Sequence, residues 1–131
     1  MRGYVLFAHG SRDPLWRRPI EAVAEHMRER LSNTADGANA QDVIPSAQVA
    51  CAYLELMDPT LPACVDGLAA QGVHTITIVP MFLGQGRHAR EDLPRLLTDL
   101  QARHPTLQFE LRSAIGEDPE IVDTLARLIL R

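Results

Sequence analysis

Short apolar stretches alternate along the chain with longer stretches of helical periodicity, and this alternation constrains the fold most. The apolar stretches cover residues 3–8, 46–54, 74–82 and 107–115. The stretch at 74–82 is rich in Ile, Val and Thr, and its apolar residues are continuous, as in a parallel strand covered on both faces. Strands that alternate with helices form a parallel sheet with right-handed crossovers. We therefore expect an α/β three-layer sandwich around a four-stranded parallel sheet.

The stretches between the strands predict four helices. Their apolar residues recur at helical spacing: Ile20, Val23, Met27 and Leu31; Leu61, Val65 and Leu68, ending at Gly72; Leu93, Leu96, Leu97 and Leu100, opening at residues 92–94; and Ile121, Val122, Leu125, Leu128 and Ile129. An Asp-Pro pair at 13–14, 58–59 and 118–119 predicts a helix cap after three of the strands. Residues 32–45 have no periodicity and predict a long loop.

The order of the strands decides which side chains meet. We expect the flavodoxin-like order 2-1-3-4, in which the first and third strands are neighbours. His9 follows the first strand, Glu55 follows the second, and His88 follows the third after a glycine-rich turn. Ligands of open α/β sheets bind outside the carboxyl ends of the strands. We therefore expect these three side chains to share one site.

Charge and length exclude several classes of protein. A chain of 131 residues predicts a single domain, residues 1–131. The net charge of -4 argues against nucleic-acid binding, which needs a basic face. No apolar stretch is long enough for a membrane span or a secretion signal, so we expect a cytoplasmic protein whose two cysteines, Cys51 and Cys64, are buried thiols.

His9, His88 and Glu55 combine two imidazoles with a carboxylate. Mixed nitrogen and oxygen donors suit Co²⁺, Ni²⁺, Fe²⁺ or Zn²⁺ and do not suit Mg²⁺ alone. A free imidazole, with a pKa of about 6.5, also accepts protons near neutral pH. Taken singly, each histidine is better explained as a capping or exposed residue. Glu55 is explained equally well as a solvated loop carboxylate or as a functional residue. Their joint placement favours a functional site, whereas His26, His74 and His104 lack that placement and are expected to be structural or surface residues.

Three arginines follow the same strand ends. The guanidinium groups of Arg12, Arg87 and Arg90 suit carboxylates or phosphates. In an acidic chain, arginines at this edge indicate an anionic ligand. The alternative is a solvated basic patch that pairs with neighbouring acidic residues on its own helix.

The turn before His88 contains two glycines and suits a close approach to a ligand. Gly84 and Gly86 allow positive φ and let the backbone come near a bound group. Ser11, in contrast, does not stand in a Gly-x-Ser-x-Gly elbow, so a serine nucleophile is not supported.

These motifs together resemble a known family. His-Gly-Ser-Arg-Asp-Pro at residues 9–14, Tyr-Leu-Glu-Leu at 53–56 and Gly-Arg-His-Ala-Arg-Glu-Asp-Leu-Pro at 86–94 resemble the class II sirohydrochlorin chelatases, in their short CbiX-type form. The resemblance covers nearly the whole chain. His-Gly-Ser alone is weak, but its combination with Gly-x-His-x-x-x-Asp-Leu-Pro is specific. The family commonly has Ile where Leu93 stands, and residues 32–45 are longer here than in its most compact members.

The resemblance implies an ATP-independent chelatase that inserts a divalent metal into sirohydrochlorin for tetrapyrrole or cobalamin synthesis. Cobalt is the expected metal substrate, with iron or nickel as alternatives and no organic cofactor. His9, His88 and Glu55 would bind the metal and take up pyrrole protons. Arg12, Arg87 and Arg90 are candidates for the substrate's carboxylates on the chemistry of their guanidinium groups rather than on a family assignment, and Ser11, Gly84 and Gly86 are also expected to contact the substrate. The short form is expected to be a homodimer.

Two other interpretations of the same residues remain open. A non-catalytic metal or tetrapyrrole carrier would use the histidine pair without turnover. A histidine phosphatase-like enzyme is suggested by the His9-Gly10 pair, although Ala8 stands where that chemistry would want a basic residue.

Overall fold

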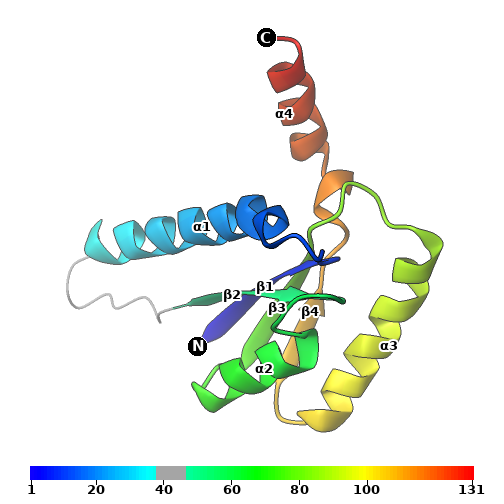
Figure 1. Ribbon diagram of the computed structural model, residues 1–131. Helices are drawn as coiled ribbons and strands as arrows, with labels where there is room; N and C mark the ends of the chain where they lie inside the picture. The colour runs from blue at the N-terminus through cyan, green and yellow to red at the C-terminus, as the bar shows by residue number, and fades with distance from the viewer. Residues whose placement is uncertain (38–46) are drawn as a thin grey trace.

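The computed structural model describes residues 1–37 and 47–131, and within them the chain builds the expected parallel sheet (Figure 1). Its strands are β1 (Arg2–Ala8), β2 (Gln48–Tyr53), β3 (Thr75–Pro80) and β4 (Gln108–Leu111). All neighbouring strands are parallel, and the order is β2-β1-β3-β4. The predicted α/β class and the order 2-1-3-4 are therefore confirmed.

Helices cover both faces of the sheet. Helix α1 (Arg18–Gly37) lies on one side, and α2 (Leu61–Ala70) and α3 (Arg87–Arg103) lie on the other (Figure 1). The core between the sheet and α2 and α3 is the larger one, with Val5, Phe7, Ile76 and Ile78 fully or almost fully buried. The smaller core under α1 is built from Leu6, Ala24, Val49 and Val79. The two apolar faces of continuous strands thus account for the two layers of helix.

The fourth helix departs from the predicted sandwich. Helix α4 (Pro119–Ile129) forms where its periodicity predicted, but none of its residues is buried. It projects away from the sheet after the short 3-10 helix η2 (Ile115–Glu117), as Figure 1 shows. The predicted helix is therefore present, but it does not lie on the sheet (Figure 1). Amphipathic spacing predicts that a helix forms. The direction in which the helix runs depends on the connection that precedes it.

Two helix boundaries also differ from the prediction. Helix α1 continues through Gly37, so residues 32–37 are helical; the rest of the predicted loop, 38–45, lies outside the described residues. Helix α3 begins at Arg87, and Pro94 lies inside it. A proline inside a helix removes one backbone hydrogen bond and crowds the carbonyl four residues earlier, and the burial of Leu93 and Leu100 offsets this cost.

The Asp-Pro pairs act as caps at two of their three positions. The side chain of Asp13 accepts from the Leu15 N–H at 2.9 Å and begins the 3-10 helix η1 (Pro14–Arg17), and Asp118 accepts from the Glu120 N–H at 2.9 Å at the start of α4. The prediction for residues 58–59 was wrong. Helix α2 is capped by Thr60, whose hydroxyl accepts from the Ala63 N–H at 3.3 Å.

Both cysteines are free thiols, as expected. Cys64 is buried in α2, and burial raises its pKa to about 11; Cys51 in β2 is half-buried, and burial raises its pKa as well. None of the helices among the described residues combines the length and apolar character that crossing a bilayer requires.

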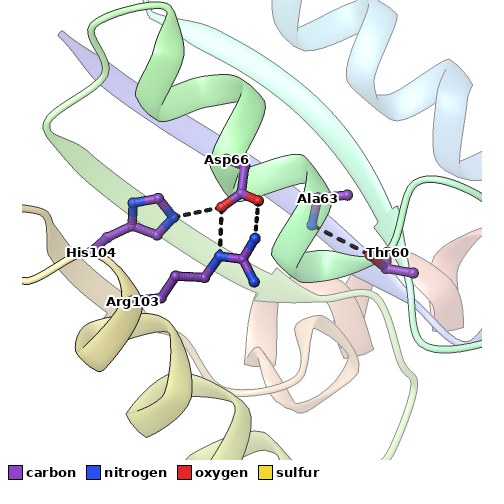
Figure 2. Close-up of polar contacts among 5 residues, drawn as sticks. All are labelled: Thr60, Ala63, Asp66, Arg103 and His104. Carbon is purple, nitrogen blue, oxygen red and sulfur yellow. Dashed lines mark hydrogen bonds and ion pairs between the residues drawn. The ribbon is translucent and has the colours of Figure 1, made fainter.

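A polar clamp joins α2 to the end of α3 (Figure 2). Arg103 donates from Nε to Asp66 Oδ1 at 2.9 Å and from a terminal nitrogen to Asp66 Oδ2, and His104 Nε2 lies 2.7 Å from Asp66 Oδ1. These hydrogen bonds, from His104 first and Arg103 second, hold the pKa of Asp66 below its ordinary value of 3.8. The ionised form of Asp66 therefore stabilises the contact between the two helices.

We expect Asp66→Asn to remove part of the acid sensitivity of the fold. Because the folded-state pKa of Asp66 is lowered, its contribution to stability is present above pH 3.8 and is lost as the pH falls through the lowered value. Melting temperatures measured between about pH 2 and pH 6 should converge for the two proteins at the acid end and differ at the neutral end. An equal difference at every pH would contradict this. Asp99→Asn, on the exposed surface of α3, is the matched control.

Candidate functional site

The carboxyl ends of β1 and β2 bring His9 and Glu55 together. The pairing of these strands continues past their ends: Leu54 N–H donates to the Ala8 carbonyl at 2.9 Å, and Glu55 N–H donates to the His9 carbonyl at 3.0 Å. Both side chains are exposed. The strand order thus brings the backbones of His9 and Glu55 into contact at one edge of the sheet.

Gly10 makes this close approach possible. Its φ is +96°, a conformation that L side chains rarely adopt. A Cβ at this position would lie 1.8 Å from the Glu55 carbonyl oxygen and 3.5 Å from Tyr53 Cβ. The two loops can therefore touch only because residue 10 has no side chain. The sequence pattern marks Gly10 only as the neighbour of His9, so the need for a missing side chain was not predicted.

The ring of His9 rests on an apolar platform. It stacks on Phe82, with the ring centroids 4.4 Å apart and the planes 29° apart. Phe82 is 6% exposed and contacts Phe7, a core residue of β1, at 6.4 Å between centroids. One face of the imidazole is thereby covered by Phe82, while His9 as a whole remains exposed to solvent.

His88 reaches the same edge from the next loop. The segment after β3 is tied to β1, since Met81 N–H donates to the Phe7 carbonyl at 2.7 Å, and it leads through Gly86 into the first turn of α3. His88 is the second residue of that helix and is exposed. The segment that carries Phe82 under His9 thus continues to His88.

The three predicted ligands do not form a closed metal cluster. Across residues 1–37 and 47–131, no group of three His, Cys, Asp or Glu side chains is positioned to hold a metal ion. The sheet brings His9 and Glu55 to adjacent backbone positions, and α3 presents His88 at the same edge without completing a three-ligand site with them. The site is an open arrangement of side chains that can accept protons or donate a lone pair to a metal.

The three arginines predicted to bind an anion, Arg12, Arg87 and Arg90, are all exposed to solvent. Arg12 is exposed directly after the His9 loop. Arg87 pairs with Glu91 at 3.3 Å, as the alternative of a solvated basic patch predicted, and its side chain is 84% exposed. Arg90 lines a hollow between α3 and the end of β4, together with Gln85 and Arg112.

The small residues predicted to contact substrate have local structural roles or open surroundings. The Ser11 hydroxyl accepts from the Asp13 N–H at 3.0 Å and so shapes the turn after His9. A Cβ added to Gly84 or Gly86 would meet no atom within 4 Å, and neither residue uses the positive φ that glycine allows. Gly86 instead is extended, with φ of -69° and ψ of 166°, and stands at the start of α3.

An apolar rim follows the strand ends, and sequence reasoning missed it. Its members are exposed large side chains in the loops after β1, β2 and β3: Leu15, Trp16, Leu54, Leu56 and Leu83. Leu56 has φ of 66°, an uncommon conformation for a residue other than glycine. Strained residues of this kind cluster at ligand-binding sites. The signal available in the sequence was a leucine placed directly after Glu55 and another directly after Phe82.

Tyr53 lies beneath this rim with an unpartnered hydroxyl. The residue is 2% exposed, and its oxygen has no hydrogen-bond partner among the described residues. Burial raises the pKa of Tyr53 to about 12. Trp16 contacts the Tyr53 ring edge-on at 6.4 Å between centroids. The neutral phenol therefore supports the rim by packing.

Comparison with known proteins finds a matching family model and similar relatives. The family model described as CbiX matches residues 3–131. The chain is 33% identical over 97 residues to the sirohydrochlorin cobaltochelatase of Methanococcus aeolicus, a match that covers 74% of this chain and 59% of the relative. It is 29% identical over 134 residues to the sirohydrochlorin cobaltochelatase of Methanosarcina barkeri, covering 97% of this chain and 93% of the relative. The chain thus spans about three fifths of the first of these relatives.

Solved structures share the fold. A putative cobalamin biosynthesis CbiX protein from Marinobacter aquaeolei matches with a TM-score of 0.75 and 32% identity, over 99% of this chain and 95% of that one. The sirohydrochlorin chelatase SirB from Bacillus subtilis subspecies spizizenii, in complex with cobalt, matches with a TM-score of 0.72 and 23% identity, over 98% of this chain and 50% of that one. The second likeness bears on the fold alone.

Proposed function

Because the chain belongs to the CbiX family, we propose that it inserts a divalent metal ion, cobalt in the first place, into sirohydrochlorin without ATP. The observation that supports the proposal is the backbone contact of His9 with Glu55 at the carboxyl edge of the sheet, while His88 follows in the first turn of α3 after the loop that leaves β3. The relatives named sirohydrochlorin cobaltochelatase support cobalt, and the sirohydrochlorin ferrochelatase of Bacillus subtilis, 29% identical over 87 residues, supports iron as the alternative.

The reaction exchanges one divalent cation for two pyrrole protons. His9 and His88 are exposed imidazoles that accept these protons and release them to solvent. Glu55, whose backbone contacts that of His9, assists as a metal ligand or as a base. An open ligand set suits this step, because an ion held by a complete set of protein ligands would not pass to the macrocycle.

The flat macrocycle and its carboxylate arms need two kinds of surface. The apolar rim, Leu56 and Leu83 among its most exposed members, offers contact for the ring system. Arg12 and Arg87 offer guanidinium groups for the carboxylates. Arg90, by the chemistry of its guanidinium group, and Ser11, Gly84 and Gly86, by their places in the turns after the strands, remain proposed substrate contacts.

We also propose that the protein is a cytoplasmic homodimer. The likeness to SirB covers about half of that chain, so a single copy of this fold accounts for half of such a molecule. A second copy would supply the facing half of the cleft that a wide macrocycle requires.

The test is an absorbance assay. Sirohydrochlorin mixed with Co²⁺ and the protein should change its absorption spectrum faster than the same mixture without protein. Parallel assays with Fe²⁺ and Ni²⁺ identify the metal preference. If the protein accelerates none of the three insertions, the proposed function is overturned.

Arg12→Gln should raise the KM for sirohydrochlorin about 10-fold and leave kcat within about two-fold, because a charge-assisted hydrogen bond of roughly 1.5 kcal/mol to a carboxylate is lost equally in ground and transition states. Steady-state kinetics at two salt concentrations measure it, and the salt dependence of KM should weaken in the variant. Arg95→Gln, in the middle of α3, is the matched control. An unchanged KM in Arg12→Gln would exclude this arginine from substrate binding.

A further inference from the structure

A small hollow lies at the carboxyl edge of the sheet, between the first two turns of α3 and the end of β4. Its volume is about 210 Å³. Two of the residues that line it are arginines, and none of the described residues in its lining is acidic. Such a concentration of one sign of charge attracts anions. We call it the Arg90–Arg112 hollow, and its other lining residues include Gln85, Leu93, Leu111 and Ser113.

Arg90 enters the hollow without a counterion. Its backbone N–H donates to the Gly86 carbonyl at 3.1 Å, but its side chain makes no hydrogen bond or ion pair within the described residues. Arg87, in the same first turn of α3, differs, since its guanidinium pairs with Glu91 at 3.3 Å. Of these two arginines, Arg90 is therefore the one whose charge is left for a ligand.

Arg112 is the second cation of the hollow, and its charge is only partly neutralised. Its Nε lies 3.5 Å from Glu110 Oε1. The other oxygen of Glu110 accepts from the Thr77 hydroxyl at 3.2 Å and lies 3.8 Å from a guanidinium nitrogen of Arg2. One carboxylate is thus shared between two arginines, which leaves a net positive charge on the group. Arg112 lines the hollow, whereas Glu110 does not.

The main chain places this hollow beside the proposed active site. Arg112 N–H donates to the Ile78 carbonyl at 3.0 Å, which continues the pairing of β3 with β4 past the end of β4. The loop after β3 carries Phe82, on which His9 stacks, and three residues later it carries Gln85, which lines the hollow. A ligand held over His9 therefore has the hollow as its neighbour along the same edge.

The size and the lining of the hollow indicate what it can hold. Leu93 is 4% exposed and Leu111 is half-buried, while Arg90 and Arg112 are exposed, so an apolar floor lies beneath a basic rim. Methylene groups suit such a floor, and a carboxylate at their end would meet the guanidinium groups. Pockets that hold whole small molecules measure about 300 to 1,000 Å³, so this smaller hollow suits one arm of a ligand.

We propose that the Arg90–Arg112 hollow is a carboxylate subsite that binds one acidic arm of the tetrapyrrole, with Arg112 as a residue that determines substrate specificity. This inference rests on the proposed function, from which it takes the substrate, and it adds Arg112 to the residues that contact it. The carboxylate accepts from both guanidinium groups, and the Ser113 hydroxyl and the Gln85 amide offer further donors. A tetrapyrrole without a charged arm at this place gains none of these contacts and binds less tightly.

The experiment is an equilibrium titration of sirohydrochlorin with the full chain in the absence of metal, followed by the fluorescence of the tetrapyrrole. Arg112→Gln should raise the Kd about 10-fold, because a charge-assisted hydrogen bond to a carboxylate is lost. Arg90→Gln should raise the Kd by about the same factor. The double variant should raise it by less than the product of about 100-fold, because both arginines bind one carboxylate. Far-UV circular dichroism checks that every variant retains its fold.

Two controls separate ligand binding from a structural role of Arg112. Glu110→Gln breaks the same ion pair from the other side and should leave the Kd within about two-fold. Methyl-esterified sirohydrochlorin, whose arms carry no charge, should bind equally to the wild type and to Arg112→Gln. An equal loss of affinity in Glu110→Gln, or a loss in Arg112→Gln that persists with the ester, would overturn the proposal. A double variant that reaches the full product would assign the arginines to different carboxylates and overturn the shared subsite.

The titration and the metal-insertion assay can fail separately. Metal insertion together with an unchanged Kd in Arg112→Gln overturns the subsite and leaves the chelatase proposal standing. Binding that depends on Arg112, in a protein that accelerates no insertion, overturns the chelatase and leaves the subsite standing.

Discussion

Replacement of His88 by Ala should lower the rate of metal insertion at saturating Co²⁺ and sirohydrochlorin by about 100-fold to 10,000-fold, the usual contribution of a positioned general base. His88 stands in the first turn of α3, exposed at the edge where β1 and β2 present His9 and Glu55. Without its imidazole, one of the two pyrrole protons has only water as its acceptor. Stopped-flow absorbance of the tetrapyrrole measures the rate of the chemical step.

The same variant separates a chelatase from a carrier. A carrier would lose binding stoichiometry for the metal or the tetrapyrrole, whereas a chelatase loses rate even when both substrates are saturating. His26→Ala is the control, because His26 is an exposed residue of α1 on which the proposed site does not depend. A His88→Ala protein with the wild-type rate at saturation would exclude His88 from proton transfer.

Gly10→Ala should lower the free energy of unfolding by about 3 kcal/mol or more, the size expected when a side chain is forced into a strained and occupied position. The backbone at residue 10 has φ of +96°, and the new methyl group would overlap the Glu55 carbonyl oxygen, 1.8 Å away. The Glu55 loop or the His9 loop must then move. Urea unfolding followed by circular dichroism gives the change in free energy.

A second glycine-to-alanine substitution distinguishes the effect of this steric overlap from the general effect of alanine on stability. Gly67 lies in the interior of α2, where an added Cβ meets no atom within 4 Å. Gly67→Ala should be stabilising by about 0.5 to 1 kcal/mol, because alanine loses less conformational entropy than glycine on entering a helix. If Gly10→Ala unfolds at the same urea concentration as the wild type, the close approach of the two loops does not limit stability.

The main part of the fold follows from local pattern together with chirality. Continuous apolar strands and amphipathic helices in alternation allow few topologies, and the order β2-β1-β3-β4 is among them. The same reasoning placed His9 and Glu55 at one edge, because residues after neighbouring parallel strands must meet there. These predictions succeed since each depends on short-range periodicity and on a general rule of connection.

The features that the sequence did not reveal depend on contacts between distant loops. The direction of α4 is set by η2 against Leu83, which no periodicity encodes. Helix α3 begins before Pro94 because the packing of Leu93 and Leu100 outweighs the one backbone bond that a proline removes. The apolar rim was not predicted, because a leucine after a strand has the same pattern whether the loop turns inward or outward.

Phe82 makes two separate contacts at opposite ends of the residue. Its ring stacks on the His9 imidazole, and its carbonyl oxygen accepts from Gly116 N–H in the η2 turn from which α4 departs. The side chain of one residue thus supports a proposed site histidine while its backbone fixes the start of the chain's last helix. A substitution at Phe82 that keeps the backbone in place would therefore remove the support of His9 and leave the η2 junction intact.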